Sequence, residues 1–367
     1  MVKAKDRLFS LDIMRGATVA GMILVNNPGS WSHIYTPLEH SEWNGCTPTD
    51  LVFPFFIFMI GVAITFALST KKQTESAGSL MPKIFKRTAL ILLIALAIKL
   101  FSKFDFSTIR YLGVLTRIAI VYMVTSLIFI KTSWLTQFRI ALGLLLVYWF
   151  IMTIIPVPGF GPANLDPETN IGAWLDRLLM SGHLWSQTVT WDPESVLGTI
   201  PAVATCLSGV MAGHLLRSKL EMKDKALWLF TIGAVSTVLG LVWGLGFPIN
   251  KALWTGSYVF YTSGIAFMCL AFCYFIFDIL KMRTGTAPLK AFGMNALAAY
   301  ILADFFAILF DKIHIDSDVS LQGWLYQHLF TPWLFPKTAS LFYALFFVGL
   351  IFIPIWMLYK KKIYIKV

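Results

Sequence analysis

The hydrophobic residues of this chain fall into long unbroken runs instead of alternating with polar residues. The run from Ala89 to Leu96, for example, contains only Ala, Leu and Ile and is apolar on every side. A helix needs about 20 such residues to cross the hydrocarbon core of a bilayer, and a spanning backbone outside a closed barrel must be helical. The pattern predicts an all-α, polytopic membrane protein with ten spans, at 9–28, 50–69, 87–103, 111–130, 138–156, 195–216, 226–246, 253–279, 288–310 and 338–359.

Lysine and arginine residues are distributed unevenly between the two ends of these spans. With the N-terminus placed inside, 21 of the 30 lie in or beside inside segments, six lie outside and three lie within spans. Cytoplasmic segments of membrane proteins are rich in these residues. Both termini are therefore predicted to be cytoplasmic, and residues 1–367 are expected to form a single transmembrane domain.

The composition of the chain excludes several classes of protein. Hydrophobic residues make up 57% of the 367 and charged residues 13%, and the mean hydropathy is +0.72. A soluble domain carries about 25% charged residues, so a soluble enzyme, a disordered protein and a disulfide scaffold are excluded. The formal net charge of +11 is better explained by loops that face anionic lipid than by phosphate binding. Membrane lipid is thus an expected partner and nucleic acid is not.

Neither disulfide nor metal chemistry is expected. The four cysteines have no CxxC spacing and are interpreted as packing residues, at Cys46, Cys206, Cys269 and Cys273. The polar loop residues His33, Glu39, His40 and Asp50 could instead form a metal site, which is the alternative considered for them. These residues show neither HxxxH nor HExxH spacing, which a metal site on a helix would favour.

Ionisable residues inside the predicted spans are candidates for function, because charge is costly in lipid. Asp12 and Arg15 lie three residues apart on one face of the first helix, and they make it a retained helix rather than a signal peptide. They form either a mutually satisfied pair or an anion site at Arg15. Arg117, two turns inside the fourth span, is either paired with a carboxylate or part of a binding site.

The outside ends of the first two spans carry the densest group of polar side chains. Asn26 closes the first span, and the Thr-Pro-Thr sequence at 47–49 can cap the second, which places Asp50 in its first turn. His40, Asp50 and Asn26 are predicted to converge on one pocket. A histidine beside a carboxylate can act as a general base, and an asparagine amide can stabilise an oxyanion. A solvated surface histidine is the alternative.

Two further outside ends add polar and aromatic residues. Asp192 and Glu194 open the sixth span, where Asp192 can simply be a helix cap. Asn250, Lys251 and Trp254 open the eighth, where a lysine can extend to the membrane surface and a tryptophan can join an aromatic belt. Together these ends are predicted to form a mixed-charge, aromatic rim that suits a sugar or an amine.

Several of these segments resemble the heparan-α-glucosaminide N-acetyltransferase family. The most specific match is His-Ser-Glu-Trp-Asn-Gly at 40–45, followed by Asp-Leu-Val-Phe-Pro at 50–54. Weaker matches follow in the same order along nearly the whole chain, at 10–16, 113–117, 192–194, 197–200, 248–254 and 293–297. The chain most resembles bacterial members of the NagX-like type.

This resemblance implies a transmembrane acetyltransferase. Acetyl-CoA would be the cytoplasmic cosubstrate, and the acetyl group would reach the amino group of a glucosamine-type sugar on the periplasmic side of a bacterial inner membrane. The family's active-site histidine falls on His40 and its acetyl-binding asparagine on Asn26. Whether His40 is the base or carries the acetyl group is left open, since imidazole can do either. Asp50 completes the expected catalytic set.

The remaining candidates are assigned to binding. Cofactor binding is expected at Asn26, Arg15, Arg117 and Asn295, and acceptor binding at Asp192, Glu194, Asn250, Lys251 and Trp254. The CoA phosphates are expected at an inside basic residue, with Arg7, Lys86, Arg87 and Arg217 left as alternatives. We expect no counterpart here of the large lumenal N-terminal domain of the animal enzyme. Glucosamine, muropeptide fragments or imported glycan pieces are therefore expected as acceptors in place of polymeric heparan.

Two other functions are weighed against the enzyme. A secondary transporter for an amino sugar fits the span number and the intramembrane charges, but the sequence lacks paired, broken helices in two matching halves. A structural membrane subunit leaves His40, Asn26 and Asp50 unexplained. The oligomeric state is left open, with a homodimer as one alternative.

Overall fold

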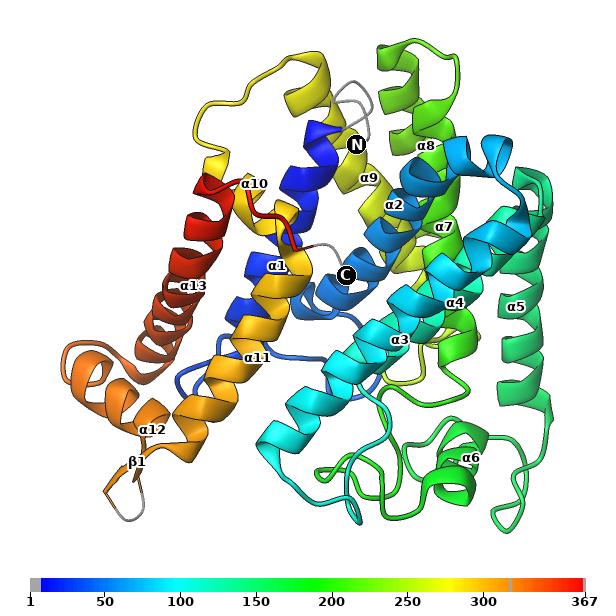
Figure 1. The fold of residues 1–367 in the computed structure, drawn as a ribbon. Helices are drawn as coiled ribbons and strands as arrows, with labels where there is room; N and C mark the ends of the chain where they lie inside the picture. The colour runs from blue at the N-terminus through cyan, green and yellow to red at the C-terminus, as the bar shows by residue number, and fades with distance from the viewer. Residues whose placement is uncertain (1–7, 317–318, 366–367) are drawn as a thin grey trace. The chain divides into compact units, whose positions relative to one another are not determined.

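A computed structural model of the chain describes residues 8–316 and 319–365 (Figure 1). Within these ranges the chain is helical apart from its loops and one short antiparallel hairpin, β1 (His314–Asp316) and β2 (Val319–Ser320). The α-helices are α1 (Phe9–Asn26), α2 (Val52–Thr74), α3 (Ala77–Ser102), α4 (Val114–Lys131), α5 (Trp134–Ile154), α6 (Ile171–Met180), α7 (Thr199–Arg217), α8 (Met222–Gly244), α9 (Gly256–Tyr274), α10 (Ala287–Met294), α11 (Ala296–Lys312), α12 (Leu321–Leu325) and α13 (Pro336–Lys360). Short 3₁₀ turns η2 (Thr36–Leu38) and η3 (Pro48–Leu51) precede α2, and π-helical turns η4 (Phe275–Ile279) and η5 (Tyr326–Phe330) follow α9 and α12.

The prediction of an all-α, polytopic membrane protein is confirmed. Among the described residues, seven helices are long and apolar enough to cross a membrane, and the bent pair α10–α11 raises the number to eight. The other two predicted spans are also helical, as α1 and α3, but both contain charged residues along their length. The ten predicted segments thus coincide with helices, while a count of ten membrane crossings stays a prediction.

The ninth predicted span, 288–310, is wrong as one straight helix. The chain turns by 85° between α10 and α11, and Asn295 lies at the turn with non-helical backbone angles. Its buried amide accepts a hydrogen bond from the Ile365 N–H (3.0 Å) and donates one to the Ile363 carbonyl (3.2 Å). The C-terminal segment therefore satisfies the polar side chain at the break, which compensates for the lost helical continuity.

The described residues group into two compact units, and each contains long apolar helices. Unit 1 comprises residues 42–46 and 54–272, in which α7 packs against α4 and α5, and α3 packs against α4. A Cβ atom on Gly61 would lie 1.9 Å from the Cys206 carbonyl oxygen, and one on Gly209 would lie 1.9 Å from that of Phe58. Only glycine therefore permits this close approach of α2 and α7.

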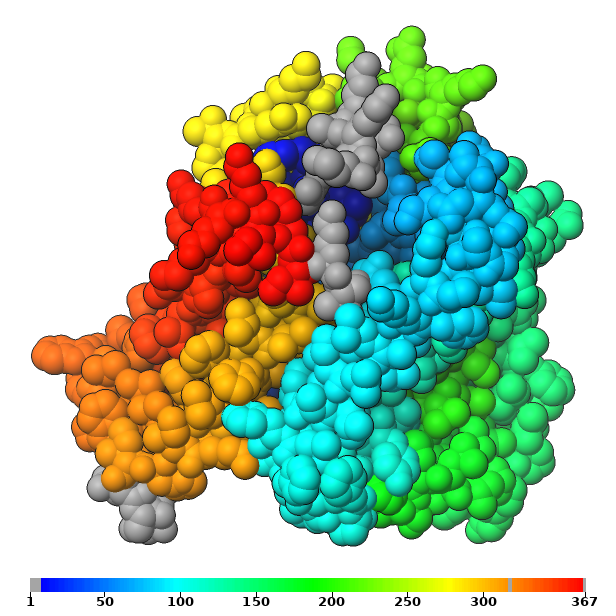
Figure 2. Space-filling view, in the orientation of Figure 1, coloured from blue at the N-terminus to red at the C-terminus, as the bar shows by residue number. Residues whose placement is uncertain are grey.

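Of the described residues, unit 2 comprises 8–41, 47–53, 273–316 and 319–365. Its α1 packs against α10, α11 and α13, and α11 and α13 also lie side by side (Figure 2). The contact between α1 and α10 is as close as that in unit 1, because a Cβ on Gly16 or Gly293 would meet a backbone oxygen of the other helix at 1.8 Å. The single transmembrane domain expected from the sequence would include both units, and it stays a prediction.

Candidate functional site

His40 and Asp50, both in unit 2, are in direct contact. The Nδ1 atom of His40 lies 2.7 Å from Oδ1 of Asp50. Asp50 is fully buried at the 3₁₀ turn η3, whereas the His40 side chain is 46% exposed. The sequence predicted that these two residues converge, and the structure brings them together. Their chemical role stays a prediction.

The second carboxylate oxygen of Asp50 is held by the neighbouring backbone. It accepts hydrogen bonds from the N–H groups of Ser41 (3.1 Å) and Thr47 (3.0 Å) and from the Thr47 hydroxyl (3.1 Å). These donors fix the orientation of the carboxylate, so Oδ1 always faces the imidazole. An imidazole that donates its Nδ1 proton to this oxygen carries its lone pair on Nε2, where it can act as base or nucleophile.

The loop that carries His40 is fastened at both sides of the histidine. The Thr47 hydroxyl also contacts the Glu39 carbonyl at 2.6 Å, and the Thr49 hydroxyl donates to the Pro37 carbonyl at 3.2 Å. Thr47 thus caps η3, as one of the two predicted capping residues, and α2 begins only after that turn. Because the loop is tied down by side chains, the histidine has a defined position although it lies outside a helix.

Asn26 is the last residue of α1 and is exposed. Its helix packs against η3, the turn that carries Asp50. The structure therefore places Asn26 in the same unit as His40, while its convergence with the histidine on one pocket stays a prediction.

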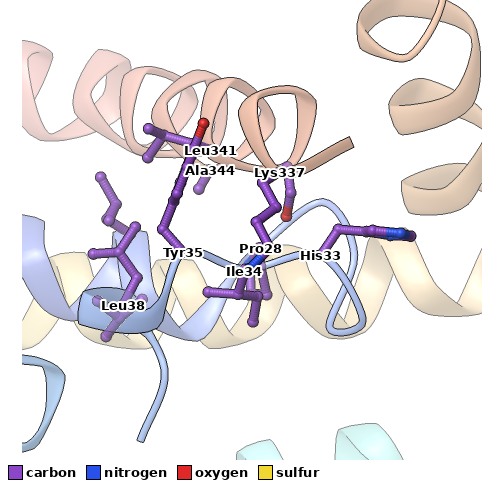
Figure 3. Close-up of a pocket in the computed structure, with 11 residues that line it drawn as sticks. Pro28, His33, Ile34, Tyr35, Leu38, Lys337, Leu341 and Ala344 are labelled. Atoms are coloured by element: carbon purple, nitrogen blue, oxygen red, sulfur yellow. The ribbon is translucent and has the colours of Figure 1, made fainter. Parts of the chain in front are cut away.

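A small pocket of unit 2 lies between the loop that follows α1 and the beginning of α13 (Figure 3). Pro28, Ile34 and Leu38 line it together with Lys337, and the His33 imidazole points away from Leu38 and Tyr35. Its volume of about 10 Å³ holds no more than one water molecule. This pocket is therefore too small for a sugar or for the thioester end of acetyl-CoA.

The structure favours the paired interpretation of Asp12 and Arg15. Nη1 of Arg15 lies 3.6 Å from Oδ1 of Asp12 and donates to the Gly293 carbonyl at 3.3 Å. Asp12 is buried, and the Arg15 side chain is 22% exposed. The guanidinium is thus already engaged within unit 2, and anion binding by Arg15 stays a prediction.

Unit 1 contains a buried ionic cluster that the sequence indicated only in part. Arg110 donates to both carboxylate oxygens of Asp192, from Nε at 2.7 Å and from Nη2 at 2.5 Å, and also to Glu194. Burial lowers the pKa of Arg110, but the two carboxylates outweigh that effect and raise the pKa above its ordinary value. Nothing local in the sequence links Arg110 to Asp192, which lies 82 positions away.

The interpretation of Asp192 as a helix cap is wrong. Helix α7 begins at Thr199, and Asp192 instead accepts a hydrogen bond from the Glu194 N–H at 2.9 Å, as in an Asx turn. Both carboxylates are buried. The carboxylates of Asp192 and Glu194 neutralise the charge of Arg110. Acceptor binding by these two residues stays a prediction.

Arg117 is among the most completely buried side chains of unit 1. Its Nη2 donates to the Ser195 carbonyl at 3.3 Å, and its guanidinium lies 4.9 Å from the centre of the Trp254 ring. Within the described residues no carboxylate forms a salt bridge with it, and its Nε and Nη1 atoms lack hydrogen-bond partners. The paired interpretation is therefore not supported, and a binding role stays a prediction.

Asp176 is a buried carboxyl group that the sequence reasoning missed. It lies on α6, an unpredicted helix of a loop, and accepts a hydrogen bond from the Val196 N–H at 3.0 Å. Burial raises its pKa to about 7, against the lowering effect of backbone donors. The sequence does contain a signal for this helix and for the burial of Asp176. Asn170 caps α6, and Asp176 lies on the apolar face of the helix with Ala173 and Met180.

The Trp-Asn-Gly motif that follows His40 is held within unit 1 by the segment before α9. The Gly45 N–H donates to the Ile249 carbonyl at 2.7 Å, and Nδ2 of Asn250 lies 3.2 Å from Oδ1 of Asn44. The Trp43 indole donates to the Leu165 carbonyl at 3.0 Å. Sequence reasoning used these residues only to recognise the family, whereas the structure gives them a defined set of contacts.

The predicted rim is wrong as an exposed surface. Asn250 and Trp254 are buried, as is Asp192, and the Trp254 indole donates to the Thr205 hydroxyl at 3.0 Å. Trp254 therefore does not belong to an aromatic belt at the membrane surface. Lys251 is half-buried. Contact between these residues and an acceptor stays a prediction.

The structure also bears on the predicted metal ligands and on the basic residues proposed for the CoA phosphates. Across residues 8–316 and 319–365, no three His, Cys, Asp or Glu side chains are grouped so that they could hold a metal ion. Of the basic candidates, Arg87 lies over the Tyr122 ring and Arg217 over the Phe66 ring. Lys86 is exposed, and Arg7 lies outside the described residues.

Comparison with known proteins identifies the family. The model described as "Heparan-alpha-glucosaminide N-acetyltransferase, catalytic" matches residues 7–242, a range that includes His40, Asp50 and the ionic cluster. The heparan-alpha-glucosaminide N-acetyltransferase of Mus musculus is 31% identical in an alignment 352 positions long, which covers 81% of this chain and 53% of the mouse protein. That of Homo sapiens is 30% identical in an alignment 418 positions long, which covers 98% of this chain and 60% of the human protein.

The chain spans between half and two thirds of the length of these relatives. The predicted residues Asn250, Lys251, Trp254 and Asn295 lie beyond the part that the family model matches, and the bacterial NagX-like subtype stays a prediction. Because the model covers more than half of the sequence, the chain belongs to the heparan-alpha-glucosaminide N-acetyltransferase catalytic family.

Proposed function

We propose that this protein is a multi-pass membrane acetyltransferase of a bacterial inner membrane. It takes an acetyl group from cytoplasmic acetyl-CoA and transfers it to the amino group of a glucosamine-type sugar on the periplasmic side. Family membership supports the reaction and the sugar class. The excess of Lys and Arg in the inside segments supports the direction of transfer.

The observation that carries this proposal is the contact of 2.7 Å between His40 and the buried carboxylate of Asp50. As a general base, His40 takes a proton from the sugar amine while the amine nitrogen attacks the thioester carbonyl and the CoA thiolate leaves. As an acetyl carrier, Nε2 attacks that carbonyl itself, the thiolate leaves, and the amine then displaces the imidazole. In both routes the Asp50 carboxylate stabilises the imidazolium or orients the neutral ring.

Asn26 is proposed to steady the thioester oxygen, with its exposed amide at the end of α1 as support. Arg117 is proposed to bind the cofactor. Two of its guanidinium nitrogens lack hydrogen-bond partners among the described residues and can donate to a ligand. The acceptor is expected to contact the polar residues around Asp192, Glu194 and Lys251. No metal is assigned a step.

A secondary transporter for an amino sugar remains the second candidate. A specific observation bears on it: among the described spans, α10–α11 is the one helix pair with a sharp break. Transporters of inverted-repeat design place broken helices at corresponding positions of both halves. A single break favours the enzyme over the transporter.

The test is acetyl transfer by the purified full-length protein in lipid nanodiscs, with radiolabelled acetyl-CoA and glucosamine. We expect labelled N-acetylglucosamine from the wild type and a loss of about 10²–10⁴-fold in rate for His40→Ala. His33→Ala is the matched control, because His33 is an exposed histidine of the same loop that contacts Ser30. Absence of transfer, together with glucosamine exchange in proteoliposomes, would establish the transporter instead. Wild-type turnover by a folded His40→Ala protein would refute the assigned role of the histidine.

A further inference from the structure

Unit 1 contains an apolar groove that is lined by none of the residues assigned above to acetyl transfer. It has a volume of about 370 Å³, within the size range of sites for small organic ligands. Each of α5, α7, α8 and α9 contributes side chains spaced by three or four residues, so one face of each helix lines the groove. Representative lining residues are Leu142, Met211, Trp228, Val235, Phe260 and Phe267.

The three serine hydroxyls that line this groove, of Ser208, Ser236 and Ser263, are already hydrogen-bonded. The Ser208 hydroxyl donates to the Thr205 carbonyl at 2.6 Å and lies 2.9 Å from the Ser263 hydroxyl. The Ser236 hydroxyl donates to the Phe260 carbonyl at 2.8 Å. A sugar or nucleotide would therefore lose most of its hydrogen bonds to water without replacement, whereas a hydrocarbon chain has none to lose.

The height of the groove matches one leaflet of a bilayer. Its lining runs along α8 from Trp228 to Leu239, about 16 Å at the helical rise, and half of the hydrocarbon core measures about 15 Å. Trp228, Val235 and Leu239 are also about half exposed. The groove is therefore open along a face that lipid would cover, and an extended acyl chain fits its length.

One end of the groove carries positive charge. Lys225 precedes Trp228 by three residues, on the same face of α8, and Arg139 follows the lining residue Phe138 on α5. From the end of α7 to the first turn of α8, the basic residues outnumber the acidic Glu221 and Asp224: they are Arg217, Lys219, Lys223 and Lys225. Basic residues at this depth attract the phosphate of anionic lipids.

We propose that this groove binds an acyl chain of an anionic phospholipid, with the lipid phosphate at Lys225. The proposal is independent of acetyl transfer. The orientation predicted from the loop charges would place this lipid in the cytoplasmic leaflet. Only that placement depends on the predicted orientation. The lipid would cover the lining residues of α8 and fill the space between α5 and α8.

The acyl-chain part is tested by native mass spectrometry of the detergent-purified full-length protein, titrated with dioleoylphosphatidylglycerol. Val235→Trp fills the groove, and we expect about tenfold weaker lipid binding, because losing the contacts of two methylene groups already has that effect. Val238→Trp is the matched control: it is 57% exposed, against 53% for Val235, but does not line the groove. We expect wild-type binding from this control.

The headgroup part is tested with the zwitterionic lipid dioleoylphosphatidylcholine. Lys225→Gln should weaken phosphatidylglycerol binding about fivefold, the effect of one basic residue near an anionic surface, and leave phosphatidylcholine binding unchanged. Lys219→Gln is the control in the same segment. A lipid with a photoreactive acyl chain should label peptides from α5 and α8 of the wild type, which requires no variant.

Three results would overturn the proposal: no saturable lipid binding, equal losses for Val235→Trp and Val238→Trp, or labelling outside the groove. A change of oligomeric state in Val235→Trp with unchanged lipid binding would also overturn it. That outcome would assign the face to a second copy of the chain.

Discussion

Replacing Asp50 by asparagine should change the proton position on His40 rather than the position of its ring. Oδ2 of Asp50 accepts from two backbone N–H groups and a hydroxyl, so the asparagine must present its oxygen to them. The opposite orientation would leave two half-buried N–H groups without acceptors, at up to about 1–3 kcal/mol each. The asparagine NH₂ then faces Nδ1 of His40. That nitrogen must become an acceptor, and the proton moves to Nε2.

An imidazole protonated on Nε2 has no lone pair at the atom that would act as base or nucleophile. We therefore expect Asp50→Asn to lower turnover by about 10²–10⁴-fold, equivalent to about 3–5.5 kcal/mol of transition-state stabilisation. Affinity for acetyl-CoA and the midpoint of thermal unfolding should change little, because every hydrogen bond at position 50 keeps a partner.

The assay is the initial rate of labelled acetyl transfer in nanodiscs, with acetyl-CoA binding measured by calorimetry on the same preparations. Glu39→Gln is the control, because it makes the same acid-to-amide change at an exposed position of the loop. The double variant with His40→Ala should be no slower than His40→Ala alone, since the two residues act as a unit. Additive losses, or a wild-type rate for Asp50→Asn, would show that the carboxylate does not act through the histidine.

Four further predictions test other parts of the molecule. Asn26→Ala should lower turnover about 10²–10³-fold with unchanged donor affinity if its amide stabilises the oxyanion; a loss of affinity alone, seen by calorimetry, would assign it to ground-state binding. Because burial raises the pKa of Asp176 to about 7, against about 3.9 in the unfolded chain, stability should fall as pH rises from about 4 to about 7, by up to about 4 kcal/mol. Asp176→Asn should flatten this dependence in thermal unfolding followed by fluorescence, and an unchanged slope contradicts the assignment. Gly293→Ala should destabilise by at least about 1–3 kcal/mol, since its Cβ would meet the Asp12 carbonyl oxygen at 1.8 Å, while Gly21→Ala in open space should not. Reporter fusions after residues 78, 135 and 221 should report cytoplasm, and fusions near 40, 175 and 325 the outside; an outside signal at 221 would contradict the predicted orientation.

The helices were predictable because lipid leaves an apolar run few alternatives to a helix. Asp50 was also predictable, since a Thr-Pro-Thr-Asp sequence indicates a capped turn from local chemistry alone. The break at Asn295 was not, because its amide is satisfied by backbone groups about 70 residues away. Local pattern contains no information about such a partner.

Predictions about the outer loops failed for a related reason. Asp192 has the sequence context of a helix cap, but its carboxylate is used by Arg110, and the helix begins seven residues later than Asp192. Trp254 was expected at the membrane surface, where tryptophan is common, yet Thr205 offers its indole a buried partner. Long-range pairing decided both cases against local preference.

The contact between Asn295 and the C-terminal segment has a consequence for genetics and for protein production. A stop codon that removes only residues 363–367 would take away the partners of both amide atoms. The buried asparagine would then be left unsatisfied, at about 1–3 kcal/mol for each polar group, at the point where the helix turns. A truncation that seems trivial by length would thus act like a substitution in the interior.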